Sequence, residues 1–212
     1  MNEDGDGGRL RDRVVAPENA VAQIARDVAV AVGVGTLVGL LLFATSGAWP
    51  PLVAVESGSM EPHLQRGDMV YVSEPGRYAP GDGVRDTGVV TFESAGEAGY
   101  QSIQRPGSVV VYERPGATGS PIIHRAMFWV EEGENWYDEA DAEYLRADDC
   151  RELANCPAPN AGLVTKGDAN GFYDQAAGVR PVRPEWIRGT AHGRVPHLGR
   201  LRLLLGFTSV GQ

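Results

Sequence analysis

The feature that most constrains this chain is an uncharged stretch of 21 residues, from Val28 to Ala48. At a rise of 1.5 Å per residue, a helix of this length would cross the hydrocarbon core of a bilayer. The apolar region of a cleaved secretory signal is shorter, although Ala44-Thr-Ser46 and Ser46-Gly-Ala48 would both fit a cleavage site. Because of the length, we expect a retained membrane-spanning helix at residues 28–48, within a helical segment at residues 17–49.

Basic residues are distributed unevenly around this stretch. Four arginines precede it, and the next basic residue, Arg66, lies well beyond it; the four are Arg9, Arg11, Arg13 and Arg26. The positive-inside rule then keeps the N-terminus in the cytoplasm. We expect a disordered cytoplasmic tail at residues 1–16, where apolar side chains are scarce, and an extracytoplasmic domain at residues 50–195. This describes a single-pass protein of the cell membrane.

The charge balance limits the partners and the chemistry. The formal net charge is -9, and Lys166 is the only lysine. Nucleic-acid binding needs a basic stripe, so an acidic chain of this kind predicts no nucleic-acid partner. An acid-rich, lysine-poor surface indicates adaptation to high salt. A single lysine also limits which general bases the protein can use.

The region after the apolar stretch predicts a mostly β fold. It contains several short runs rich in β-branched and aromatic residues, separated by Gly and Pro, and no amphipathic helical repeat. We expect a β domain of short strands with irregular loops. The predicted strands lie at residues 67–72, 89–92, 108–112, 122–130 and 187–195.

Two further segments of this region have distinct compositions. From Glu131 to Glu152, ten of 22 residues are Asp or Glu, which predicts a solvated insertion at residues 131–160 with one amphipathic helix. Cys150 and Cys156 lie within it, and outside the cytoplasm such a lone pair indicates a disulfide rather than a metal site. The final segment, residues 196–212, contains an apolar run that is too short to span a bilayer. It would lie on the membrane surface or pack against the domain.

Ser59 is the candidate nucleophile. It stands in Ser57-Gly-Ser59-Met60-Glu-Pro62, where a predicted strand end meets a tight turn that could present its hydroxyl to a cleft, although such runs are also common in ordinary loops. A hydrolytic serine needs a base, a group that orients the base, and donors for the oxyanion.

The four histidines of the chain differ in their surroundings. His124 alone ends an apolar pair in a predicted buried strand, a position that also fits a core histidine. His63 is expected on the surface, while His192 and His197 lie in a Gly- and Pro-rich region. Asp168 and Asp174 could orient a base or could cap their own loop.

Taken together, these blocks resemble the type I signal peptidases, in the branch found in archaea and the endoplasmic reticulum. With the salt-adapted composition, this resemblance implies a source in a halophilic archaeon. The stretch 57–62 resembles the nucleophile box, and 67–72 resembles the strand after it. Ile122-Ile-His124-Arg125 resembles the base box, with histidine where the bacterial branch has lysine, and 165–174 resembles the acidic box. Ala169 departs from the pattern, because asparagine is common there in this branch, and the chain lacks the second spanning helix of some relatives.

The resemblance implies a role for each matched residue. Ser59 would be the nucleophile, His124 the general base, Asp174 the group that orients it, and Asp168 a second, supporting acid. The resemblance leaves open which aspartate contacts His124. The Ser59 N–H and the Ser57 hydroxyl would form the oxyanion hole, and Met60 would line the substrate groove. No metal or cofactor is implied.

The implied activity is removal of signal peptides from exported preproteins after small residues, by a serine endopeptidase. Its expected partners are the signal peptides of preproteins, membrane lipid and the Sec export machinery. Two other hypotheses stay open at this point. One is a catalytically silent membrane-tethered module that binds the export machinery. The other is a self-cleaving Ser-Lys regulator, which would need a lysine where His124 stands.

Overall fold

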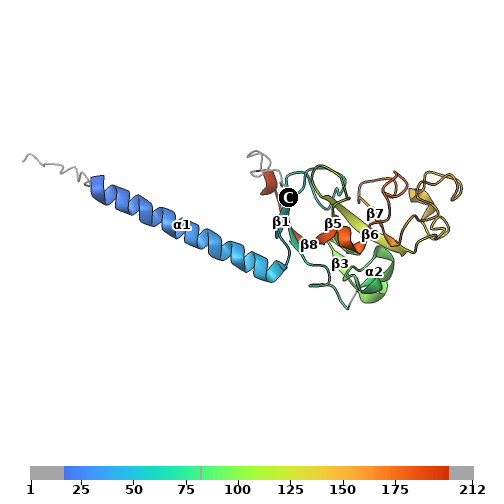
Figure 1. Cartoon of the computed structure of the whole chain (residues 1–212), viewed down its shortest axis with the longest axis horizontal. Coiled ribbons are helices and arrows are strands. Elements are labelled where there is room, and N and C mark those ends of the chain that lie inside the picture. Colours follow the sequence, from blue (N-terminus) through green and yellow to red (C-terminus); the bar gives the residue numbers. More distant parts are fainter. Residues whose placement is uncertain (1–16, 82, 201–212) are drawn as a thin grey trace, which may run out of the picture. The chain divides into compact units, whose positions relative to one another are not determined.

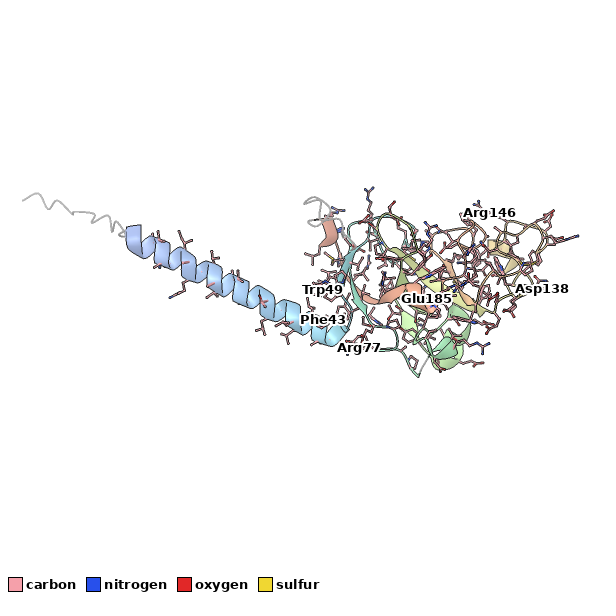
Figure 2. All side chains as sticks on the ribbon, viewed as in Figure 1. Phe43, Trp49, Arg77, Asp138, Arg146 and Glu185 are labelled. Atoms are coloured by element: carbon pink, nitrogen blue, oxygen red, sulfur yellow. A yellow bond between two sulfur atoms is a disulfide. The ribbon has the colours of Figure 1, made fainter. Side chains whose placement is uncertain are left out.

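The computed structural model describes residues 17–81 and 83–200, and the chain divides after Leu41 into two compact units. Helix α1 (Pro17–Ser46) forms the first unit and continues into the second. Within the described residues, one helix is long and apolar enough to cross a membrane, at Ala20–Ser46. Its apolar side chains are exposed along its length (Figure 2). An exposed apolar surface of this extent is what a lipid-facing helix presents.

Helix α1 ends two residues before the predicted end of the apolar span. Gly47 adopts a left-handed conformation, with φ of 68°, and its N–H donates to the Phe43 carbonyl at 2.7 Å. Glycine is the usual residue at such a helix stop, so Gly47 and Ala48 lie outside the helix. The expected cytoplasmic tail and the apolar run at residues 201–207 lie outside the described residues.

The second unit is built around one antiparallel sheet in the order β1-β2-β8-β5-β6-β7 (Figure 1). A separate two-stranded sheet pairs β3 (Gln101–Ser102) with β4 (Arg105–Pro106). The mostly β fold predicted from sequence is confirmed. The strands of the main sheet are β1 (Leu52–Ala54), β2 (Met69–Ser73), β5 (Val109–Tyr112), β6 (Ile122–Val130), β7 (Gly162–Lys166) and β8 (Ile187–Val195).

The prediction of a strand at residues 89–92 is wrong. Val89 and Val90 are buried without joining a ladder, and Phe92 opens the short helix α2 (Phe92–Ala98), which packs against β6. The Thr91 hydroxyl caps the helix by accepting the Ser94 N–H at 3.2 Å. A hydroxyl N-cap satisfies a free N–H of the first turn, and here it decides the local structure. The described part of the chain also contains the one-turn helices η1 (Val84–Asp86), η2 (Ala142–Tyr144) and η3 (Pro184–Trp186).

The acidic insertion has a core of its own. Trp136 is fully buried, its indole N–H donates to the Asn155 carbonyl at 2.7 Å, and its ring meets those of Phe128 and Tyr173. Charged side chains such as Asp138 and Arg146 lie on the outside (Figure 2). The insertion is therefore packed on its inner side and solvated on its outer side.

The amphipathic helix predicted for the insertion is absent, and residues 131–160 contain only the single turn η2. Aspartates accept hydrogen bonds from nearby backbone N–H groups, as Asp141 does from Glu143 and Asp149 does from Arg151. Such bonds favour turns over a continuous helix. Cys150 and Cys156 form a disulfide within this run of turns.

Candidate active site

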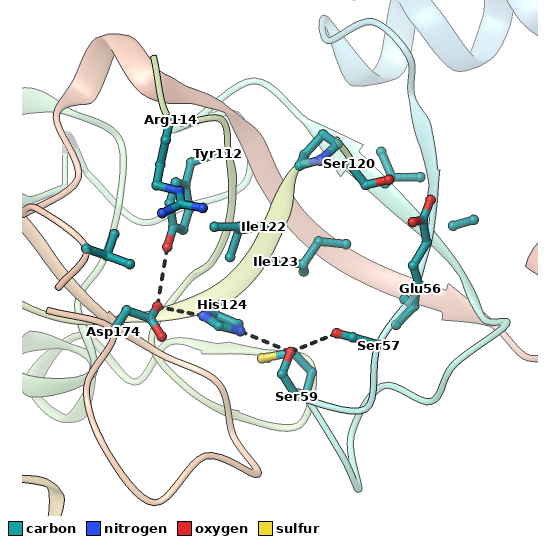
Figure 3. A pocket seen from close by; sticks show the side chains of 16 residues that line it. Glu56, Ser57, Ser59, Tyr112, Arg114, Ser120, Ile122, Ile123, His124 and Asp174 are labelled. Atoms are coloured by element: carbon teal, nitrogen blue, oxygen red, sulfur yellow. Dashed lines mark hydrogen bonds and ion pairs between the residues drawn. The ribbon is translucent and has the colours of Figure 1, made fainter. Parts of the chain in front are cut away.

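Three distant parts of the chain meet at one end of a groove (Figure 3). Ser59 lies in the turn after β1, His124 is the third residue of β6, and Asp174 lies in the loop after β7. The turn is held by hydrogen bonds from the N–H groups of His63 and Leu64 to the Met60 carbonyl, at 3.0 and 2.9 Å. Strand β6 is paired on both sides, with β5 and β7, which fixes the backbone that carries His124.

The side chains of these three residues form a continuous line. Ser59 Oγ lies 3.0 Å from His124 Nε2, and His124 Nδ1 lies 2.6 Å from Asp174 Oδ2 (Figure 3). An ionised carboxylate only accepts hydrogen bonds, so Nδ1–H of His124 donates to Asp174. In the neutral imidazole, Nε2 is then free to accept the serine proton. His124 and Asp174 are both buried, while Ser59 is half-buried.

Asp174 is held by further donors to the same oxygen. Oδ2 accepts from the Thr165 hydroxyl at 2.7 Å and from the Tyr112 hydroxyl at 3.3 Å. Burial and the nearby Asp174 carboxylate raise the pKa of Tyr112 far above its usual value, so its phenol keeps its proton and remains a donor. These two donors fix the carboxylate in the orientation that meets the imidazole.

Ser57 and Met60, on either side of Ser59, have different surroundings. The Ser57 hydroxyl lies 3.1 Å from Ser59 Oγ, where a donor could reach a developing oxyanion (Figure 3). Met60 is almost fully buried against Val55 and Leu64, and it also lines the groove. It therefore joins the sheet core to the floor of the groove.

Asp168 lies away from His124. Its carboxylate takes a bidentate pair from Arg125, Nε to Oδ1 at 2.8 Å and Nη2 to Oδ2 at 2.7 Å. His63 Nδ1 lies 3.0 Å from Oδ2, and Arg105 Nη1 lies 3.5 Å from Oδ1. Of the two aspartates, Asp174 is the one in contact with His124, which the sequence left open. His63, which was expected on the surface, is half-buried, with its side chain 18% exposed.

Sequence reasoning missed the role of Arg125. Its guanidinium is buried and, besides Asp168, donates through Nη1 to four backbone carbonyls: those of Ser102, Arg105, Pro106 and Gly107. The sequence did indicate a structural role for Arg125, because a charged side chain inside an apolar strand needs a buried partner. Tyr112 and Thr165 gave no such signal, because they are ordinary strand residues.

The side chain of Lys166 contacts the loop that follows β7. Its ammonium donates to the carbonyls of Gly167 and Asn170, at 3.2 and 2.8 Å, and lies 4.3 Å from the centre of the Tyr144 ring. Burial lowers the pKa of Lys166. The residue is absent from the lining of the groove, so the chain's only lysine is not placed to act on Ser59.

The groove itself has a volume of about 440 Å³. Its walls come from the end of β1, the segment that follows it and the start of β6, and most of their surface is apolar, although Glu56 and Arg114 also line the groove. Such a lining favours apolar ligands that have few polar groups to desolvate. The aliphatic residues of the walls are Val53, Ala54, Val55, Ile122, Ile123 and Val179.

A serine hydrogen-bonded to a histidine, which is in turn hydrogen-bonded to a buried carboxylate, is the arrangement found in serine hydrolases. In this chain it lies on an antiparallel β domain that follows an apolar helix. Comparison with known proteins narrows this class. The chain is 29% identical over 171 residues to the signal peptidase complex catalytic subunit of Aspergillus oryzae, covering 79% of this chain and 70% of that protein. The corresponding subunit of Dictyostelium discoideum is 25% identical over 195 residues, covering 89% and 79%.

No family model matches the chain. The similarity to these catalytic subunits nevertheless extends over most of its length, and it includes a third relative from Aspergillus terreus at 27% identity over 175 residues. The chain is an enzyme, a hydrolase of the signal peptidase type. Together with the apolar helix, the relatives support a membrane-anchored protein.

Proposed function

We propose that this protein is a membrane-bound serine endopeptidase that removes N-terminal signal peptides from exported preproteins. The observation that carries the proposal is the line from Ser59 through His124 to Asp174 at the end of an aliphatic groove. The named activity of the relatives supports the substrate class, since they are catalytic subunits of signal peptidase complexes. Export machinery of the Sec type is the proposed source of the substrates.

The proposed reaction runs through an acyl-enzyme. Ser59 Oγ attacks the carbonyl carbon of the scissile peptide bond while His124 Nε2 takes the serine proton. The resulting imidazolium is stabilised by the Asp174 carboxylate, and it then protonates the leaving amine, which departs as the mature protein. Water, with His124 again as base, hydrolyses the ester between Ser59 and the signal peptide and restores the free hydroxyl.

The oxyanion of each tetrahedral intermediate would be met by the Ser59 N–H and the Ser57 hydroxyl. Support comes from the 3.1 Å separation of the two serine oxygens, which places the Ser57 donor beside the reacting centre. Fixed donors of this kind stabilise charge that appears only during reaction. Asp168 enters this mechanism as a supporting acid that acts through the backbone around Ser59 and not by contact with His124.

The proposed topology places the N-terminus in the cytoplasm, helix α1 across the cell membrane and the β domain outside. The connection from the end of α1 to Ser59 is short, at residues 47–58. A preprotein that is still inserted in the same bilayer would meet the enzyme at high effective concentration. The acid-rich composition supports a halophilic origin, and the named relatives themselves are eukaryotic.

The substrate class can be tested with the full-length protein in proteoliposomes. A preprotein with a small residue before its signal cleavage site should be cut there, and N-terminal sequencing of the product should give the mature terminus. The control is the same preprotein with that small residue replaced by a bulky aromatic residue, which should be cut at least tenfold more slowly. Equal cleavage of both, or cleavage elsewhere in the chain, would refute the proposed specificity.

A further inference from the structure

The loop after β7 closes directly on the backbone of the nucleophile turn, residues 59–64. The Ala169 N–H donates to the Ser59 carbonyl at 2.9 Å, and the Asp168 N–H meets Met60 Sδ at 3.5 Å. A Cβ placed on Gly167 would lie 2.6 Å from the Ser59 carbonyl oxygen, so the two backbones touch with no space between them. The position of Ser59 therefore depends on where this loop lies.

The loop is fixed from the other side through Asp168. Its carboxylate, 2% exposed, receives two hydrogen bonds from Arg125, the neighbour of His124 on β6. Arg105 on β4 approaches the same carboxylate. Neither arginine belongs to the nucleophile turn. Arg125 holds the loop to the sheet that carries the base, and Arg105 connects the loop to the separate β3–β4 pair, so these contacts do not by themselves hold the turn.

His63 supplies the side-chain connection from the turn. It stands four residues after Ser59, and its backbone N–H closes the turn onto the Met60 carbonyl at 3.0 Å. Its Nδ1 atom is buried and lies 3.0 Å from Oδ2 of the Asp168 carboxylate, a close polar contact that lacks the geometry of a hydrogen bond. Asp168 is thus the point where the strand of the base, through Arg125, and the turn of the nucleophile, through His63, come together.

We propose that His63 is a positioning residue for the peptidase reaction, which acts through Asp168 to hold Ser59 Oγ in reach of His124 Nε2. The proposal rests on the proposed function and adds a residue to it. The link would matter most during acylation, since a displacement of about 1 Å between reacting groups can cost about a hundredfold in rate. His63 is absent from the lining of the groove, so substrate affinity should be independent of it.

The test compares two replacements of similar size in the full-length protein. His63→Gln keeps a side-chain N–H that can donate to Asp168, and His63→Leu does not. We expect His63→Leu to lower kcat for preprotein cleavage by ten- to a hundredfold with KM within twofold of wild type, and His63→Gln to recover most of that loss. The matched control is His192→Gln, because His192 contacts Ser73, Thr190 and Tyr78 and not the nucleophile turn.

A second measurement reports on the conformation of the nucleophile turn. In methyl spectra of methionine-labelled protein, His63→Leu should shift the Met60 resonance and leave that of Met127 in place, because Met127 lies in a separate core cluster. If the leucine variant does not fold, His63→Ala replaces it in both experiments. A kcat within twofold of wild type, equal losses in the Leu and Gln variants, or an unshifted Met60 resonance would overturn the role of His63. Failure of the wild type to cleave would instead overturn the proposed function.

Discussion

At the scale of single residues, one carboxylate oxygen fixes the orientation of the proposed base, His124. Asp174 Oδ2 accepts from His124, Thr165 and Tyr112, and the shortest of the three separations is the one to the imidazole, at 2.6 Å. A carboxylate in this position selects the tautomer in which Nε2 is the acceptor, and it stabilises the imidazolium that forms when Ser59 loses its proton.

Replacing Asp174 with asparagine should therefore remove most of the activity. An amide can donate to Nδ1 and favour the wrong tautomer, so kcat for preprotein cleavage should fall by about 10³- to 10⁴-fold with KM nearly unchanged. Tyr112→Phe is the matched control. It removes the longest of the three bonds and should cost tenfold or less. A kcat for Asp174→Asn within tenfold of wild type would be inconsistent with the role given to Asp174.

Gly167 provides a test of how tightly Ser59 is held. Since an added Cβ would meet the Ser59 carbonyl oxygen at 2.6 Å, Gly167→Ala must push the nucleophile backbone or the loop aside. We expect kcat to fall by about a hundredfold. Gly171→Ala, where a Cβ would meet nothing within 4 Å, should leave kcat near the wild-type value. Equal activities in the two variants would show that the close contact has no catalytic consequence.

At the scale of elements, periodicity predicted the long strands well and failed where side-chain capping decides the outcome. Strands β6 and β8 have the predicted bounds, and the long, mostly apolar run of β6 accounts for its length. Helix α2 was missed, since its seven residues contain only Ala95 as a buried side chain and its start depends on the Thr91 cap. Likewise, the buried Trp136 lies in an acidic sequence whose average character is that of a surface.

The disulfide of the insertion should contribute to stability and not to catalysis. Cys150 and Cys156 are six positions apart, and closing so short a loop stabilises the folded state by about 2 kcal/mol on the chain-entropy model. The double replacement by serine should lower the free energy of unfolding by about that amount and leave kcat unchanged, because neither cysteine lines the groove. Denaturant unfolding and preprotein cleavage measure the two quantities. A large loss of kcat in a folded variant would contradict this assignment.

His192 on β8 should make stability depend on pH. Burial lowers its pKa, so the folded protein keeps it neutral while the unfolded chain takes up a proton below about pH 6.5. Its contribution is fully present above that pH and is lost as the pH falls through the lowered pKa. The free energy of unfolding should thus decrease between pH 7.5 and 5.5, and the decrease should be smaller in His192→Gln. Identical pH dependence in both proteins would contradict the prediction.

At the scale of the whole molecule, the sequence predicted which kinds of residue form the site but not how they are joined. Ser59, His124 and Asp174 lie in three segments that only the sheet brings together. Both aspartates of the acidic box have the same local character, and the choice between them depends on the path of the loop after β7. The pairing of Asp168 with Arg125 and His63 is likewise a tertiary contact, so no local pattern could predict it.

The central claim is that Ser59 is the nucleophile of a membrane-anchored peptidase, and one measurement tests it most directly. Wild type and Ser59→Ala, purified in full length and matched for folding by circular dichroism, are each incubated in proteoliposomes with the same signal-bearing preprotein. The wild type should release the mature protein, and the Ser59→Ala variant should show a rate at least 10³-fold lower, since removal of a catalytic serine can cost about 10⁶-fold in kcat. Processing by Ser59→Ala at a rate near that of the wild type would contradict the claim.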